Sequence, residues 1–232
     1  ADLRADAEDA IGWPHLSAIL TEDQVAGRGR LDRVWTAPAG SAIALSVLLR
    51  VPRIPVAERG WIPLAAGLAL ADAVAAQLPG RAVGVKWPND VLVGERKICG
   101  ILAEATGSDA VIVGSGVNTR MTAEQLPVPT ATSFAVEGVG VDVDLLVAGY
   151  LARLDGGMEL LAEHGSAVAS GLRDAVAARC LTLGRTVRVM LPGGADLTGV
   201  AIGLGEDGCL IVDVEGAERR IAAGDIVHLR LV

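Results

Sequence analysis

Several residue types are scarce in this chain of 232 residues, and each scarcity excludes a class of protein. With four tryptophans, one tyrosine and one phenylalanine, the core must consist mostly of alanine, valine and leucine. The three cysteines, Cys99, Cys180 and Cys209, are far apart and form no CxxC pair. This pattern argues against a disulfide framework or a zinc site and favours reduced thiols in a cytoplasmic protein.

Long apolar runs and excess positive charge are also missing. No run of 18 uncharged apolar residues occurs, and the acidic start ADLRADAEDA is unlike a signal peptide, so we expect no membrane association. The formal net charge of −8 argues against broad nucleic-acid binding, because phosphates would be repelled. The histidines lack metal-ligand spacing, and no P-loop, GxSxG or HExxH motif occurs. A nucleotide would therefore need another kind of binding site.

The spacing of apolar residues predicts an α+β chain. Strands are expected at 15–21, 41–51, 83–87, 91–93, 97–105 and 110–117. Helices are expected at 1–12, 56–78, 142–164 and 166–180, with a capping box at 122–125 that opens a further short one. The turn Gly94-Glu95 should join two of the strands as a hairpin. We predict a mixed β-sheet flanked by helices as the domain of residues 1–183.

From Gly184 onward the sequence changes to short strands joined by Gly-rich turns. Five are expected, at 186–191, 196–203, 209–214, 218–222 and 226–231. Strands of this length and number are typical of a small β-barrel. Residues 184–232 are therefore predicted to form a second, barrel-like domain.

The segment Gln24-Val-Ala-Gly-Arg-Gly-Arg30, which continues through Arg33 and Trp35, combines glycine with arginine. Its glycines let the backbone approach a ligand closely, and its arginines can grip phosphate or carboxylate through two hydrogen bonds. Such a loop suits a reaction that brings two anions together. An exposed basic turn explains this segment, taken alone, about equally well.

Three further motifs follow along the chain. Lys86-Trp-Pro-Asn-Asp90 places an ammonium, an amide and a carboxylate at one strand edge. Taken singly, these residues would be explained as the end of a strand followed by a turn. In Arg96-Lys-Ile-Cys-Gly-Ile-Leu-Ala-Glu104, a lysine begins an apolar strand, either to face a ligand or merely to flank a turn. Gly114-Ser-Gly-Val-Asn118 on its own is better explained as a turn. Both lysines of the chain lie within these motifs.

Taken together, in this order and at these separations, GRGRxxRxW, KWPND, RKxxGIL and GxGxN resemble the catalytic domain of biotin–protein ligases. The resemblance is strong over residues 15–120 and looser up to the C-terminal strands, where such ligases carry an SH3-like β-barrel. It implies the class II synthetase-like fold of biotin/lipoate ligases. It also implies that biotin and Mg-ATP give biotinyl-5′-adenylate, from which biotin passes to a lysine of a biotin carboxyl carrier domain.

The resemblance also implies roles for individual residues. Arg30, Lys97 and Asp90 would be catalytic, with Lys97 polarising the acyl-phosphate linkage and Asp90 acting as general base toward the acceptor lysine. The implied biotin contacts are Gln24, Arg28, Gly29, Arg30 and Lys97. The implied nucleotide contacts are Arg30, Arg33, Trp35, Lys86 and Asn118. No metal ligand is assigned, since Mg2+ should travel with the nucleotide phosphates.

Two departures and several alternatives accompany this interpretation. Such ligases carry a Ser-Thr-Asn stretch before the first helix, and some carry a winged helix that binds an operator; neither precedes Ala1, so we expect no repressor role. A lipoate–protein ligase shares the architecture and the acyl-adenylate chemistry. A non-catalytic biotin-responsive regulator would not need Asp90 and Lys97, and an SH3-like interaction module would leave the Gly-Arg loop unexplained. Both a monomer and a homodimer are compatible with the sequence.

Overall fold

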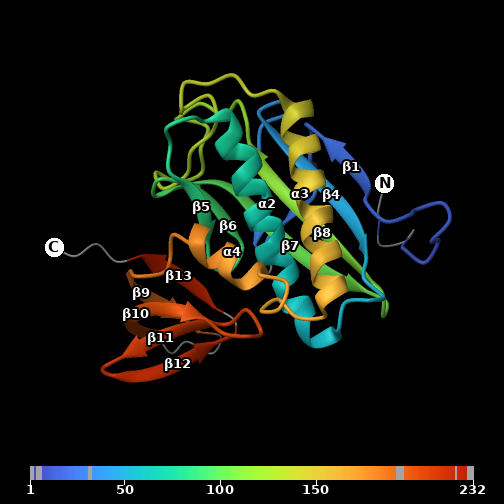
Figure 1. Ribbon diagram of the computed structural model, residues 1–232. Coiled ribbons are helices and arrows are strands. Elements are labelled where there is room, and N and C mark those ends of the chain that lie inside the picture. The colour runs from blue at the N-terminus through green and yellow to red at the C-terminus, as the bar shows by residue number, and fades with distance from the viewer. Residues whose placement is uncertain (1–2, 4–6, 31–32, 192–195, 223, 229–232) are drawn as a thin grey trace.

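Two β-sheets organise the protein, whose structure is a computed structural model that describes residues 3, 7–30, 33–191, 196–222 and 224–228. The larger sheet has six strands and carries two long helices on one face (Figure 1). The smaller sheet has five strands and lies at one end of the larger one, next to a short helix (Figure 1). The predicted α+β class, a sheet with helices followed by a C-terminal β module, is confirmed.

The larger sheet is built from neighbouring strands that all run antiparallel. Parallel pairing within the described residues is limited to two isolated bridges, Val85 with Cys180 and Lys97 with Ala131. A turn at Gly94 joins β6 to β7, as the sequence predicts. The strand order is β1 (Ser17–Thr21), β4 (Ala42–Arg50), β8 (Ala110–Asn118), β7 (Arg96–Thr106), β6 (Asp90–Val93) and β5 (Val83–Lys86).

The helix-covered face of this sheet holds the main core. The 3-10 helix η1 (Val56–Trp61) leads directly into α2 (Ile62–Gln77), with Pro63 in the first turn, where a proline costs no hydrogen bond. α2 packs against β5, β6 and β7 and against α3 (Val143–His164). Asp142 caps α3 by accepting a hydrogen bond from the Leu145 N–H at 3.0 Å. These helices agree with the predicted ones.

The segment Val56–Gln77 is long and apolar enough to cross a membrane by length and composition. However, 61% of its most apolar window is buried inside the protein. Ala66, Ala71 and Val74 have no exposed surface, and they pack within the main core. These contacts are those of a core helix.

The C-terminal strands form an open sheet instead of a closed barrel. Their order is β12 (Ala217–Ile221), β11 (Leu210–Val214), β10 (Asp196–Leu204), β9 (Thr186–Met190) and β13 (Asp225–His228). Among the described residues β12 and β13 have one strand partner each, so the sheet keeps two edges. β12 exposes Glu218, Arg219 and Arg220, and such charges disfavour pairing at an edge. Residues 229–231 of the last predicted strand lie outside the described residues.

Other local predictions need correction. Residues 122–125 form a turn, because Pro127 and Pro129 follow too closely for a helix to continue. The helix predicted from Ser166 begins only at Leu172, as α4 (Leu172–Arg179), because the Ser166 hydroxyl accepts hydrogen bonds from Val168 and Ala169 and holds a turn. The helix predicted at 1–12 lies partly outside the described residues, and residues 7–12 form turns.

Two tryptophans connect the sheets. Trp61 at the end of η1 is fully buried and donates from Nε1 to the Glu206 carbonyl at 2.7 Å. Trp87, after β5, donates from Nε1 to the Gly208 carbonyl at 2.9 Å. Both acceptors belong to one turn between β10 and β11, in which Gly208 has φ +82. A buried indole requires a partner for its N–H, so these bonds fix where the C-terminal sheet sits.

Candidate functional site

A floor of very small side chains lies on the sheet face opposite the helices. Ala44 of β4 pairs with Gly116 of β8, which pairs with Gly100 of β7. In the next row Ser46 pairs with Gly114. Because side chains alternate between the two faces of a strand, one face of these strands can carry large apolar residues while the other, in these two rows, carries only small ones. The space left above the floor belongs to a cavity of about 840 Å3.

The same cross-strand row continues into charged residues. Gly100 pairs with Asp90 of β6, and Asp90 pairs with Lys86 of β5. The row therefore runs from a neutral floor to a carboxylate and an ammonium within three neighbouring strands. Burial lowers the pKa of Lys86, the Asp90 carboxylate raises it in opposition, and the Lys97 ammonium lowers it further.

A β-bulge brings Lys97 to the side of the sheet that carries Asp90. The register shifts between Val91 and Leu92, which makes Ile98 an extra residue in β7. Without it, Lys97 and Gly100 would face opposite sides of the strand. With it, Lys97 Nζ lies over Gly100, 2.9 Å from where a Cβ atom would be. The ammonium is 2.7 Å from Asp90 Oδ1, so the cation and the carboxylate meet at the edge of the floor.

The Gly/Arg segment forms a small hairpin above the floor. Its two short strands, β2 (Gly27–Arg28) and β3 (Val34–Trp35), pair antiparallel. The Trp35 indole lies against Gly116, where a Cβ atom would be 2.7 Å from ring carbon Cε2. Glycine is thus required at position 116 for the indole to rest on the floor, and the hairpin serves as a roof over the cavity.

Two arginines of the hairpin reach across to the large sheet. Arg28 Nη2 lies 3.4 Å from Glu104 Oε2 of β7. Arg30 Nη1 donates to Asn89 Oδ1 at 3.1 Å, and the Asn89 amide in turn donates to the Ile101 carbonyl at 2.7 Å. Arg30 is therefore held next to Asp90 by the residue that precedes this carboxylate in the chain.

The C-terminal sheet also reaches the site. Arg33 forms an ion pair with Asp225, the first residue of β13. Arg30 donates from both terminal nitrogens to the Gly224 carbonyl at 3.4 Å. The hairpin thus has contacts with both sheets, and the contacts of Arg30 with Gly224 and of Arg33 with Asp225 depend on where the C-terminal sheet sits.

This arrangement can bring an anionic group and a phosphate together. Guanidinium groups from the hairpin and the Lys97 ammonium line a cavity whose floor consists of small and largely uncharged side chains. A flat, largely neutral ligand can lie on such a floor, while its anionic end and a phosphate share the cations at the rim. The neighbouring Asp90 carboxylate can accept a proton from an incoming amine.

Most residues predicted for the site line this one cavity. They are Gln24, Arg28, Gly29, Arg30, Arg33, Trp35, Asp90 and Lys97. Lys86 lies one strand away, paired with Asp90. Asn118 is buried, and its amide donates to the Thr132 carbonyl at 2.9 Å, so the structure gives it a local role in joining β8 to the following segment.

Sequence analysis did not identify several residues that the structure adds to the site. Gly100, Gly114 and Gly116 belong to the floor. The spacing of Gly114 and Gly116 indicated that these two share a face of one strand, although not which face. Glu104 and Asp225 are ion-pair partners of the hairpin. Asp225 carried no signal, because it is 192 residues from Arg33 in the chain.

Comparison with known proteins gives a consistent result. Residues 7–118 match the biotin/lipoate A/B protein ligase family, and residues 182–229 match the biotin protein ligase C terminal domain. The chain is 41% identical to the biotin–[acetyl-CoA-carboxylase] ligase of Mycobacterium tuberculosis over 91% of its own length and 79% of that protein. It is 30% identical to the bifunctional ligase/repressor BirA of Escherichia coli over 90% of its own length and 65% of that protein.

Solved structures show the same likeness. The biotin protein ligase of Aquifex aeolicus, in complex with biotin and ATP, superposes with a TM-score of 0.78 at 27% identity, covering 97% of this chain and 94% of that one. The ligase of Leishmania major in complex with biotinyl-5-AMP gives a TM-score of 0.62 at 26% identity, covering 98% and 93%.

Proposed function

The chain belongs to the biotin–protein ligases, and from this premise we propose how its residues carry out ATP-dependent attachment of biotin to a protein lysine. The observation that carries the proposal is the Lys97–Asp90 pair, with its 2.7 Å separation, set between a small-residue floor and an arginine hairpin. The floor would hold the rings of biotin, and the rim would hold its carboxylate beside the nucleotide phosphates.

The first step joins two anions. A carboxylate oxygen of biotin attacks the α-phosphorus of ATP, the bond from that phosphorus to the bridging oxygen breaks, and pyrophosphate leaves. Arg28 and Arg30 offset the repulsion between the carboxylate and the phosphate, and Lys97 stabilises the charge that develops on the acyl-phosphate linkage. Gln24 and Gly29 also line the cavity and would complete the biotin contacts.

The second step transfers the biotinyl group. The acceptor lysine attacks the acyl carbon as a neutral amine, the bond from carbon to the phosphate oxygen breaks, and AMP leaves. Asp90 accepts the proton that the amine loses or orients the amine for attack. The negative adenylate competes with Asp90 for Lys97, so formation of the intermediate would release Asp90 for this task. The two half-reactions are coupled through one ion pair.

Further contacts would belong to the nucleotide. Arg33, Trp35 and Lys86 lie along or beside the hairpin, with Arg30 shared between the biotin and nucleotide sides. Asn118 would contact the nucleotide through the end of β8. The described residues include no cluster of three His, Cys, Asp or Glu side chains suited to a metal. Mg2+ would reach the site with the ATP phosphates.

The acceptor we propose is the biotin carboxyl carrier domain of an acyl-CoA carboxylase. The name of the M. tuberculosis relative, a biotin–[acetyl-CoA-carboxylase] ligase, supports it. The division into a catalytic domain of residues 1–183 and a C-terminal domain of residues 184–232 belongs to the same proposal. So does a cytoplasmic location, which the three free, buried cysteines support.

Biotin is favoured over lipoate by two observations. The C-terminal strands match the biotin protein ligase C terminal domain, and the relatives reported above are named for biotin. Lys97 and Asp90 are both present and in contact, which favours an enzyme over a regulator that only binds biotin.

Transfer of labelled biotin tests the proposal. The purified chain is incubated with ATP, Mg2+, labelled biotin and a biotin carboxyl carrier domain, beside Arg30→Ala and Lys97→Ala. We expect label on one acceptor lysine and a loss of about 100-fold or more in kcat for each variant, because each removes a cation from the developing charge. Arg188→Ala is the matched control, since Arg188 is exposed on β9 and outside the cavity.

Each other outcome selects a different function. Binding of biotin without transfer would favour the regulator. Activation of lipoate or octanoate without biotin binding would show that biotin is not the substrate. Unimpaired variants would contradict the proposed roles while leaving the reaction itself established.

A further inference from the structure

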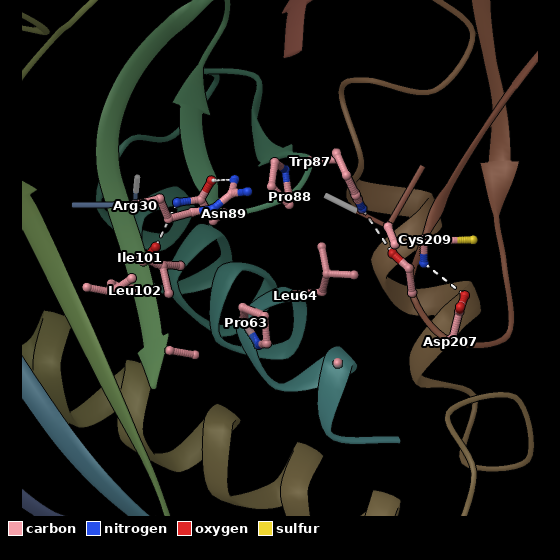
Figure 2. Close-up of a pocket in the computed structure, with 14 residues that line it drawn as sticks. Arg30, Pro63, Leu64, Trp87, Pro88, Asn89, Ile101, Leu102, Asp207 and Cys209 are labelled. Carbon is pink, nitrogen blue, oxygen red and sulfur yellow. Dashed lines mark hydrogen bonds between the residues drawn. The ribbon is translucent and has the colours of Figure 1, made fainter. Parts of the chain in front are cut away.

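A second, smaller recess adjoins the catalytic cavity. It has a volume of about 310 Å3 and lies between the start of α2, the middle of β7 and the turn Asp207–Cys209 of the C-terminal sheet (Figure 2). This is about twice the size of a cavity that binds benzene, roughly 150 Å3. One wall is the C-terminal turn, which the two tryptophan bonds join to the catalytic domain.

The recess and the catalytic cavity share a border. Arg30, Asn89, Ile101 and Leu102 line both spaces. In Figure 2 Arg30 and Asn89 lie on one side of the recess, joined by their hydrogen bond. Asn89 directly precedes Asp90, so a group in the recess lies next to the residue proposed to receive the acceptor lysine.

The walls of the recess favour an apolar guest. Pro63, Leu64 and Pro88 face it, together with Trp87 (Figure 2). Several polar groups around it are engaged within the protein: the Asn89 amide donates to the Ile101 carbonyl, Trp87 Nε1 donates to the Gly208 carbonyl, and Asp207 Oδ1 accepts from Cys209 and Arg220. A nucleotide base would need free donors and acceptors, and burial of its polar atoms without them would be costly. An apolar side chain has no such need.

We propose that this recess binds an apolar side chain next to the target lysine of the acceptor protein, and so contributes to the choice of acceptor. The proposal rests on the proposed function, because only a protein acceptor delivers a side chain beside the reacting amine. It also gives the C-terminal sheet a direct part in substrate recognition, through the turn that closes the recess.

The test uses a recess-filling variant and two pairs of acceptors, one pair for each neighbour of the target lysine. Ala222 lines the recess but is itself exposed, so Ala222→Phe can fill the space without disturbing the core. Ala217→Phe is the matched control, because Ala217 is exposed on β12 and outside the recess. The acceptors are biotin carboxyl carrier domains in which each neighbour of the target lysine is, in turn, leucine or alanine.

Two half-reactions are measured separately. Biotin-dependent pyrophosphate release without acceptor reports adenylate formation, and transfer of biotin to each acceptor reports kcat/KM. For the wild-type chain we expect leucine on one side of the lysine to raise kcat/KM about tenfold over alanine, since burying leucine is favourable. In Ala222→Phe this ratio should fall to near one, with pyrophosphate release and the KM for ATP unchanged. Ala217→Phe should behave as wild type.

Three results would overturn the inference. They are equal transfer by the wild type to the leucine and alanine acceptors of both pairs, a ratio that survives in Ala222→Phe, or a raised KM for ATP in that variant, which would assign the recess to the nucleotide. A wild-type chain that releases no pyrophosphate with biotin and ATP would instead contradict the proposed function, so the two failures are distinguishable.

Discussion

Where the sheet forms the floor of the cavity, its two faces are made by the same strands and differ strongly in side-chain size. Toward the helices, β4 and β8 direct Val47, Leu49 and Val113, each with no exposed surface. On the other face they present Ala44, Ser46 and Gly114 at the floor, and farther along Leu48 and Ile112, which belong to a separate buried cluster. Stability therefore depends mainly on the first face, and ligand binding depends mainly on the second.

One short sequence motif contributes to both the cavity floor and the helix-covered core. In Gly114-Ser-Gly-Val-Asn118 the glycines face the cavity, while Val117 packs in the main core. Each glycine on the floor lacks a side chain that could bury apolar surface and stabilise the fold. The densely packed opposite face provides most of this stabilisation instead. A substitution on one face should therefore change binding with little effect on stability, and a substitution on the other face should do the reverse.

The largest effect is expected for Gly116→Val. The new side chain would collide with the Trp35 indole, only 2.7 Å from the added Cβ, and would occupy the floor. We expect biotin affinity to fall by about 100-fold or more, equivalent to about 3 kcal/mol, measured by titration calorimetry. The melting temperature should change little, because the added atoms enter the cavity and leave the helix-covered core untouched.

Gly140→Val is the control for Gly116→Val. Nothing lies within 4 Å of a Cβ atom at Gly140, so the same substitution there should leave both quantities unchanged. Normal biotin affinity in Gly116→Val would contradict the assignment of the floor.

Val113→Ala tests the helix-covered face. Val113 pairs with Val47 and Ala103 and is fully buried. Loss of two methyl groups and the resulting cavity should lower the free energy of unfolding by about 2–3 kcal/mol. For a chain of this size the melting temperature should fall by about 5–10 °C. Biotin affinity, measured at low temperature, should stay within twofold of wild type, and a larger loss would mean that the faces are not independent.

The sequence made the two faces only partly predictable. The strands, the long helices and the Gly94 turn follow from local periodicity, which depends on neighbours in the chain. The floor was missed because a glycine in a strand gives no information about which face it occupies until its pairing is known. The closed barrel was wrong because closure depends on edge strands, and β12 carries charges at its edge.

The site residues divide in the same way. Arg28, Arg30, Asp90 and Lys97 belong to contiguous motifs, and the structure places them around one cavity. The bulge at Ile98, which turns Lys97 toward Asp90, has no signature in the sequence. Long-range partners such as Asp225 depend on how the two sheets dock, which only the tertiary structure provides.

The smallest effect is expected for Ser115→Ala, which tests whether the faces alternate residue by residue. Ser115 lies between two floor glycines, but its Oγ is 3.4 Å from the Tyr150 hydroxyl of α3, on the helix-covered side. The long distance implies a weak bond, so its loss should lower the free energy of unfolding by about 1 kcal/mol or less. Biotin affinity should be unchanged, although the next residue is Gly116. Tyr150→Phe should give a similar loss, and the double variant should lose less than the sum, because both changes remove the same bond. A Ser115→Ala variant with weakened biotin binding and full stability would show that Ser115 belongs to the floor. The residues of β8 would then not alternate strictly between the two faces.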